Sequence, residues 1–288
     1  MLHPQRVMLT TYYGLRRRLR MALRLPARRR PPPVLSQAVE AVVERHGMIA
    51  RAAMANKPAG LDLCGKNVCE VGSGDCLAAI ALFLGLGARH VDVFEIADPV
   101  TNDKQVEVLK RLRAQGLPID VGVIRADTMT LDTERVTFHK GYMEDFKGPA
   151  VVDFMFSFSV MEHVEDLDGF YRASHRIMTP GAQMLHMVDL GGHEVFEDPL
   201  PPLDFQTYSE WLYNLMYLKY HRATRRFLDE HKAAVERNGF KILNLTPTRT
   251  ASEEYLSEIW PKLRPEAHAR PRADVGVIEF ALTARKQG

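Results

Sequence analysis

A glycine turn that joins an apolar run to a helix constrains the fold of this chain more than any other feature. The run Lys66–Val71 predicts a buried strand, and Cys76–Leu86 predicts a helix. The turn between them includes the sequence Glu70-Val71-Gly72-Ser73-Gly74-Asp75. Strand, glycine turn and helix in this order are the context in which backbone atoms approach a small ligand closely. The turn therefore predicts an α/β fold with a ligand site at the end of this strand.

Strand and helix patterns alternate along most of the chain. Further strands are predicted at His90–Ile96, Val136–Lys140, Val151–Ser157 and Gln183–Val188, and helices at Val34–Asn56, Thr101–Gln115 and Leu167–Met178. The last two apolar runs, Lys241–Thr246 and Val275–Ala284, are expected to form an antiparallel edge. Together these seven runs predict a doubly wound, seven-stranded, mostly parallel sheet with an antiparallel edge strand.

The charge of the chain is unevenly distributed. The net charge is +2, but residues 1–30 hold nine arginines and no acid, which leaves 29 basic and 36 acidic residues in the remainder. Pro31-Pro32-Pro33 ends any helix, so we expect a basic arm at 1–33 and the main domain at 34–288. Within the arm, Tyr12, Leu15, Leu19 and Leu23 recur at helical spacing, with Arg16, Arg20 and Arg24 on another side. This pattern predicts either peripheral contact with an anionic membrane or an arm that packs on its own domain.

Several classes of protein are excluded by composition. No run of 18 apolar residues occurs, so a spanning helix is not expected. Cys64, Cys69 and Cys76 are too few and too close for a disulfide framework, and the start lacks the pattern of a secretory signal. We therefore expect a cytoplasmic protein, with any membrane contact on the inner face. No basic stripe with interleaved aromatics follows the arm, so nucleic-acid binding is not expected.

The residues in the glycine turn favour a cationic ligand over a dinucleotide. A dinucleotide site needs a small residue where Leu77 stands, and Asp75 adds a negative charge that would repel pyrophosphate. S-adenosylmethionine carries a sulfonium and an ammonium but no phosphate, and Glu70 can hold the ammonium directly or through water. Glu95, at the end of the next strand, can accept hydrogen bonds from both ribose hydroxyls.

With these residues the chain resembles the class I S-adenosylmethionine-dependent methyltransferases, in particular the small-molecule branch with a Glu-x-Gly-x-Gly first motif. The resemblance continues through Val152-Asp153-Phe154 to Glu162-His163-Val164, followed by Thr179-Pro180-Gly181. It implies the Rossmann-like methyltransferase fold. It places Met143 and Glu144 near the adenine, and Ser157 and Phe158 at the methionine end. The expected cofactor residues are Glu70, Val71, Gly72, Ser73, Gly74, Glu95, Ile96, Met143, Glu144, Ser157 and Phe158.

Methyl transfer mainly requires alignment of the reacting atoms, and a base is needed only for a hydroxyl acceptor. His163, after the fourth strand, is the first candidate base, although it can equally be a structural histidine at a helix start. His193 is the second candidate, with His186 and Asp189 as alternatives. Metal-dependent quinone-pathway O-methyltransferases are similar at Glu162-His163, but Ser159 stands where they carry a first acid, so no metal is expected.

The segment at about 191–232 is too long for a simple connection and predicts an inserted helical lid. This segment resembles the corresponding part of methyltransferases that accompany glycosyltransferases in bacterial surface-polysaccharide pathways. The resemblance rests on Val188 through His193, Pro199, Tyr208-Ser209-Glu210-Trp211 and Tyr220-His221-Arg222. The aromatics can stack on a sugar or simply form the core of the lid. We expect methylation of an oxygen on a small-molecule or saccharide acceptor. The alternatives are N- or C-methylation of a lipid or quinone-like acceptor and a non-catalytic binding module.

Overall fold

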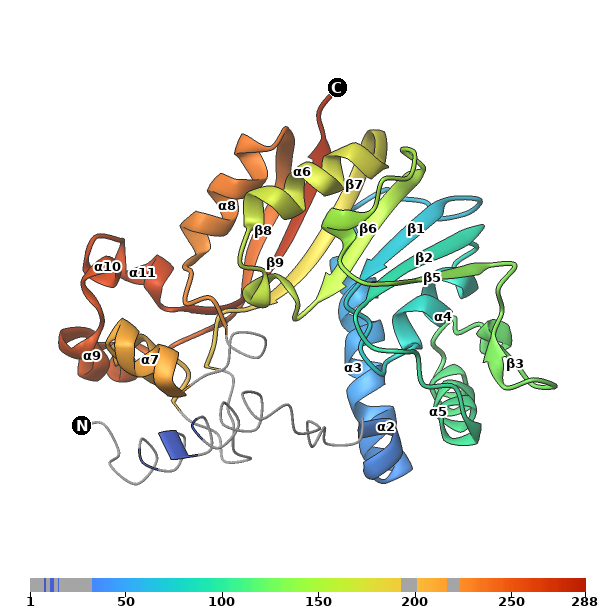
Figure 1. Ribbon diagram of the computed structural model, residues 1–288, viewed down its shortest axis with the longest axis horizontal. Helices are drawn as coiled ribbons and strands as arrows, with labels where there is room; N and C mark the ends of the chain where they lie inside the picture. Colours follow the sequence, from blue (N-terminus) through green and yellow to red (C-terminus); the bar gives the residue numbers. More distant parts are fainter. Residues whose placement is uncertain (1–7, 9–10, 13–14, 16–32, 193–200, 217–222) are drawn as a thin grey trace.

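A seven-stranded sheet with helices on both faces forms the centre of the molecule (Figure 1). The computed structural model describes residues 8, 11, 12, 15, 33–192, 201–216 and 223–288. The sheet order is β5-β2-β1-β6-β7-β9-β8. Its strands are β1 (Asn67–Val71), β2 (His90–Glu95), β5 (Val136–Lys140), β6 (Val152–Phe158), β7 (Met178–Asp189), β8 (Phe240–Thr250) and β9 (Val277–Lys286). The predicted doubly wound fold is confirmed.

Five strands of the sheet, from β5 to β7, run parallel to their neighbours. β9 pairs antiparallel with both β7 and β8, which confirms the predicted antiparallel edge. The last strand of the chain, β9, lies between β7 and β8, so β8 forms the edge of the sheet.

Helices cover both faces of the sheet (Figure 1). The first face carries α3 (Val39–Asn56), α4 (Ala78–Gly85) and α5 (Asp103–Ala114), and the second carries α6 (Leu167–Ile177) and α8 (Leu228–Arg237). Every residue of α4 from Ala78 to Leu84 is buried. A helix that is apolar on all sides needs cover on all sides, and here the sheet and α3 provide it. This packing holds the preceding glycine turn in place.

The N-terminal part of the main domain differs from the expected single helix. It consists of α2 (Pro33–Ser36) and α3, separated at Gln37 and Ala38. In the arm, Tyr12 and Leu15 are exposed, whereas Leu19, Leu23 and the arginines opposite them lie outside the described residues. In the described part of the chain, we find no helix that combines the length and apolarity needed to cross a membrane.

Two insertions pack together beyond the ends of β8 and β9, and we call their described residues, 201–216, 223–227 and 251–276, the cap (Figure 1). Its elements are η4 (Asp204–Thr207), α7 (Glu210–Met216), α9 (Glu253–Ile259), η5 (Trp260–Lys262), α10 (Pro265–His268) and α11 (Arg272–Val275). Leu203 and Phe227 of the first insertion share an apolar cluster with Leu256 and Ile259 of the second. The sequence predicted only the first insertion, and residues 228–232, expected in it, belong to α8.

A buried arginine fastens the first insertion. Arg225 is 4% exposed and donates hydrogen bonds to the carbonyl oxygens of Gln206 and Tyr208, the latter at 2.7 Å. Its backbone has φ +60°, which turns the chain toward α8. Irregular backbone needs donors for its buried carbonyls, and Arg225 supplies them. The cap is therefore a packed unit with its own polar anchor.

Candidate functional site

The order of the strands places the candidate site at one edge of the sheet. Chain order reverses beside β1, because β2 and β5 lie on one side of it and β6 and β7 on the other. Ligands of open α/β sheets bind at the carboxyl ends of the strands at such a point. In the register, Val71 is paired with Phe94 of β2 and with Ser157 of β6, so these strands end together. The glycine turn, Glu95 and the segment after β6 are thereby brought together.

Glycine is required at the two positions of the turn for different physical reasons. Both have positive φ, +74° at Gly72 and +58° at Gly74. A Cβ on Gly72 would lie 2.3 Å from Cγ2 of Val160, so the segment after β6 rests directly on this glycine. A Cβ on Gly74 would meet nothing within 4 Å. Gly72 therefore permits a close approach within the protein, and Gly74 leaves open space for a ligand.

Two buried polar side chains at the turn have unpartnered atoms in the described structure. Glu70 is 3% exposed and Ser73 is 7% exposed, and Glu70 Oε2 and Ser73 Oγ make no hydrogen bond. Burial, and secondarily the charge of Glu95, raises the pKa of Glu70 to about 8. Leaving such groups unpaired costs about 1–3 kcal/mol each, which a polar ligand can recover.

Glu95 is held against the turn by backbone donors. Its Oε2 accepts from the Gly74 N–H at 2.7 Å, and its Oε1 accepts from Ile96 at 2.7 Å and Ala97 at 3.1 Å. A carboxylate has about four acceptor positions, so one remains for a ligand hydroxyl. The hydrogen bonds fix the carboxylate beside the turn before any ligand arrives.

Asp75 does not play the part expected from the sequence. Its carboxylate forms an ion pair with Arg45 of α3 and accepts from the Val34 N–H at 2.7 Å. Although burial opposes it, the hydrogen bonds from Arg45 and Val34 lower the pKa of Asp75. Its charge is compensated within the protein, so the expectation that Asp75 repels pyrophosphate is wrong. The exclusion of a dinucleotide then depends on Leu77, which is fully buried and stands where a dinucleotide site needs a small residue.

The residues expected near the adenine lie at the ends of β2 and β5. Ile96 is 57% exposed and Tyr142 is 55% exposed, and the Gly141 N–H donates to the Glu95 carbonyl at 2.9 Å, which keeps the two strand ends adjacent. Met143 is buried in η2 (Met143–Asp145). Burial raises the pKa of Glu144 in the same turn. These strand ends offer apolar side chains next to Glu95.

The side chain of Ser157 is turned into the sheet packing. Its Oγ is hydrogen-bonded to His186 Nδ1 at 2.7 Å, and both residues are fully buried. Burial lowers the pKa of His186 to about 3, so this histidine is neutral and out of reach of an acceptor. Ser157 can thus meet a ligand only through its backbone. Phe158 is partly buried against the apolar cluster of α3, α4 and α5.

His163 lies in the short turn η3 (Met161–His163) that follows β6. It is partly exposed, and its backbone N–H donates to the Val160 carbonyl at 2.9 Å. Ser159, just before, has φ +52°, a strained conformation for a residue with a side chain. The segment between β6 and α6 packs Val160 against Gly72, and His163 follows three residues later in the chain. His193 lies outside the described residues.

Carboxyl groups gather beside η3 at the ends of β7 and β9. Burial raises the pKa of Glu162 well above its usual range, and Asp189 and Glu279 also raise it. Asp189 and Glu279 are paired across the strands, and Arg249 of β8 lies 3.5 Å from the first and 2.7 Å from the second. The Thr224 N–H of the cap donates to the Glu162 carbonyl at 2.7 Å. This acidic side of the site therefore meets the cap.

No group of three or more His, Cys, Asp or Glu residues in the described ranges has a geometry that could hold a metal ion. The structure therefore adds no metal centre to the site within these ranges.

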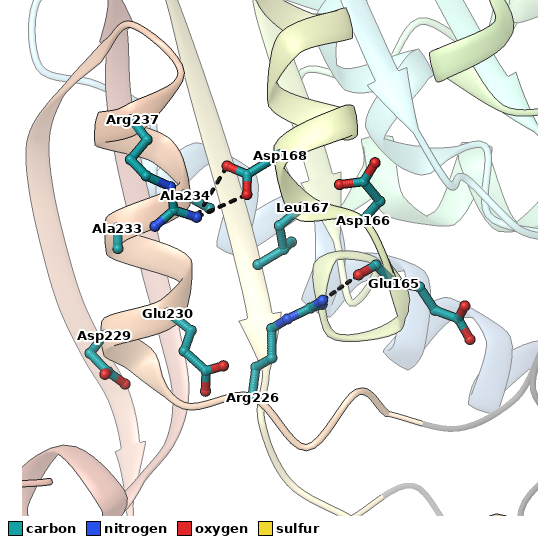
Figure 2. A pocket seen from close by; sticks show the side chains of 10 residues that line it. All are labelled: Glu165, Asp166, Leu167, Asp168, Arg226, Asp229, Glu230, Ala233, Ala234 and Arg237. Carbon is teal, nitrogen blue, oxygen red and sulfur yellow. Dashed lines mark hydrogen bonds and ion pairs between the residues drawn. The ribbon is translucent and has the colours of Figure 1, made fainter. Parts of the chain in front are cut away.

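A cavity of about 310 Å³ lies between α6 and α8 (Figure 2). Figure 2 shows Arg237 directed at Asp168 and Arg226 at the main chain of Glu165. Asp229 and Glu230 at its rim are paired with Arg270. It shares no lining residue with the glycine turn, and the ion pair between Arg237 and Asp168 joins the two helices. We therefore interpret this cavity as a consequence of the packing of α6 against α8, separate from the ligand site.

Sequence reasoning missed two residues that shape the site, Val160 and Arg45. Val160 seats on Gly72 and Arg45 neutralises Asp75. Neither carries a local signal, because each acts on the turn from a distant part of the chain. Only the packing of η3 and α3 against the turn reveals them.

Several solved structures are similar to this chain. One chain in the complex between the Haloferax volcanii Trm112 methyltransferase activator and a protein assigned as a methyltransferase is 17% identical, with a TM-score of 0.51 over 89% of this chain and 96% of that chain. An S-adenosylmethionine dependent methyltransferase from Mesorhizobium loti is 16% identical, with a TM-score of 0.44 over 86% of this chain and 100% of that chain. Phosphoethanolamine N-methyltransferase 2 of Haemonchus contortus, in complex with S-adenosyl-L-methionine, is 17% identical, with a TM-score of 0.49 over 83% of this chain and 53% of that chain. No protein-family model and no curated protein sequence matches the chain. The first of these similarities supports the methyltransferase fold.

Proposed function

We propose that this chain, which has the Rossmann-like methyltransferase fold, is an S-adenosylmethionine-dependent methyltransferase. The observation that carries the proposal is a pair of polar atoms at the glycine turn, Glu70 Oε2 and Ser73 Oγ, that have no hydrogen-bond partner among the described residues. They lie where a sheet of this strand order binds its ligand. An amino group and a carboxylate, as found at the methionine end of this cofactor, supply the partners that the two atoms lack.

The residues of the site divide the work of binding. Glu70 pairs with the ammonium, and the free acceptor position of Glu95 takes a ribose hydroxyl. Ile96 provides exposed apolar surface for the adenine, next to the turn that Met143 begins, and the open side of Gly74 leaves room for the ligand. When bound, S-adenosylmethionine supplies a methyl group on a cationic sulfur, which an acceptor lone pair displaces in line. The chain contributes alignment, which is worth several orders of magnitude in rate.

Isothermal titration calorimetry tests the cofactor directly. We expect S-adenosylmethionine to bind with measurable heat at one site, and NAD to give none, because Leu77 stands where a dinucleotide site needs a small residue. Tight binding of NAD, or no heat with S-adenosylmethionine, would contradict the proposed function.

The acceptor that we propose is an oxygen of a small molecule or saccharide. Trp211 on α7 is 73% exposed, which gives the cap an aromatic surface for a sugar. His163, behind Val160, is the proposed base for a hydroxyl acceptor, and His193 is the second proposed base.

Replacing His163 with alanine should lower kcat by at least about 100-fold for a hydroxyl acceptor, since general-base catalysis contributes 10²–10⁴-fold. The affinity for S-adenosylmethionine should stay nearly the same. Turnover is measured with a methyl-labelled donor and the acceptor that a screen identifies. His90→Ala is the matched control, because His90 lies at the amino end of β2, whereas the site lies at the carboxyl ends of the strands. Equal turnover by wild type and His163→Ala would remove His163 as a base.

The second acceptor class that we propose is a nitrogen or a carbon atom. Mass and fragmentation of the labelled product identify the methylated atom and so separate oxygen from nitrogen or carbon acceptors, including lipid or quinone-like ones. A chain that binds the cofactor but methylates no acceptor would be a binding module instead.

The location that we propose is the cytoplasm, with the arginine-rich arm in contact with the inner face of an anionic membrane. Nine arginines without an acid in residues 1–30 support this contact. Nucleic acid is not among the proposed partners.

A further inference from the structure

We propose that Glu70 couples cofactor binding to the release of one proton, so that the site binds S-adenosylmethionine more weakly as the pH falls below neutrality. This inference rests on the proposed function and adds its regulation by pH.

Among the residues that the structure describes, none places a counter-charge on Glu70. Strand alternation puts its side chain on the same face as Val68, under α3, α4 and α5. It is 3% exposed, Oε2 has no hydrogen-bond partner, and the described residues form no ion pair with it. A buried carboxylate in this position would be unpaired in low dielectric, which strongly disfavours its charged form.

The charged groups on the neighbouring elements add to this effect. Glu95, at the end of β2, is a second negative charge, and backbone N–H groups hold it beside the turn. From α3, Arg45 is paired with Asp75. Burial, and then Arg45, lowers the pKa of His46 to about 4, so this histidine is neutral.

The two buried thiols near Glu70 supply no charge either. Burial raises the pKa of Cys69 and of Cys76, so both stay protonated. Burial and Glu95 together raise the pKa of Glu70 to about 8. In the unliganded protein at pH 7, Glu70 is therefore a neutral acid.

A cationic amine reverses this balance. When the ammonium of the cofactor reaches Glu70, the carboxyl O–H bond breaks, the proton leaves to solvent, and the carboxylate forms an ion pair with the ammonium. One proton is released for each cofactor bound below the pKa of the free site. Linkage then requires the affinity to fall about tenfold per pH unit between pH 7 and pH 6. An α-amino group has an ordinary pKa of about 7.7–8.0, so the amine of the cofactor is mostly protonated over this range.

Calorimetry with the full chain at pH 6.5 tests the inference, using buffers that work at this pH and differ in ionisation enthalpy, such as phosphate and imidazole. The dependence of the observed heat on buffer ionisation enthalpy gives the number of protons released. We expect close to one proton for S-adenosylmethionine. Methylthioadenosine, which keeps the adenine and ribose but lacks the amino and carboxylate groups, should release none.

Glu70→Gln is the matched variant, because it removes the proton and keeps the shape. It should bind S-adenosylmethionine with the same affinity at pH 6 and pH 7 and release no proton. Binding to the wild type without proton release, or equal release with methylthioadenosine, would overturn the inference and leave the proposed function standing. If the wild type gives no binding heat in any buffer, the proposed function fails, and this inference fails with it.

Discussion

Replacing Gly72 with alanine should lower the free energy of unfolding by about 3 kcal/mol and weaken S-adenosylmethionine binding more than tenfold. Two costs add. The backbone at φ +74° costs a residue with a Cβ about 1–2 kcal/mol. The new Cβ also lies 2.3 Å from Val160 Cγ2, and overpacking of this kind costs typically 1–3 kcal/mol. Relief of the clash moves the segment after β6, which carries His163. Urea unfolding and calorimetry measure the two effects.

Two further variants separate these costs. Gly74→Ala has the backbone cost alone, since its Cβ meets nothing within 4 Å, and it should lose only about 1–2 kcal/mol of stability. Val160→Ala removes both γ carbons and leaves its Cβ at 3.4 Å, so the double variant Gly72→Ala/Val160→Ala should recover the steric part. If Gly72→Ala and Gly74→Ala unfold with equal free energies, the contact between Val160 and Gly72 has no energetic importance.

Replacing Glu70 with glutamine should stabilise the unliganded protein at pH 7 by about 3 kcal/mol. The pKa of Glu70 is about 8 in the folded chain, against an ordinary value of 4.5. Because folding raises this pKa, the associated stability is complete below pH 4.5 and is lost as the pH rises toward 8, at about 1.4 kcal/mol per pH unit. Glutamine cannot ionise, so the free energy of unfolding of the variant does not fall with pH for this reason. The difference between variant and wild type should be near zero at pH 4.5 and grow up to pH 8.

Urea unfolding at several pH values measures this difference, with unchanged m-values as the sign that only stability has changed. Glu254→Gln is the control, because Glu254 is exposed on α9 and its profile should follow that of the wild type. Parallel stability profiles for wild type and Glu70→Gln would mean that Glu70 is already ionised in the folded protein.

The strand and helix order was predictable because the signals for it are local. Apolar runs and their periods mark strands and helices within a few residues of sequence. The turn at Gly72 and Gly74 was recognisable for the same reason, and both glycines have the positive φ that such a turn requires. The break between α2 and α3 and the second insertion at 251–276 were missed, since their short helices carry too few turns for a clear period.

The site was predictable only in its outline. The sequence placed Glu70 and Glu95 at strand ends, and the register of β1 and β2 brings those ends together. The roles of Asp75 and Ser157 could not be inferred, because Arg45 and His186 engage their side chains from other elements. His193 stays a prediction, since it lies outside the described residues.

The sequence by itself determined the doubly wound sheet and the position of the ligand turn, because hydrophobic periodicity and glycine conformation act over a few neighbouring residues. Only the tertiary structure decided the protonation of Glu70, the neutralisation of Asp75 and the close contact between Val160 and Gly72. Each of these depends on burial or on a contact between distant parts of the chain. Burial, charge pairing and steric contact are properties of the packed molecule, and they set the chemistry of the site.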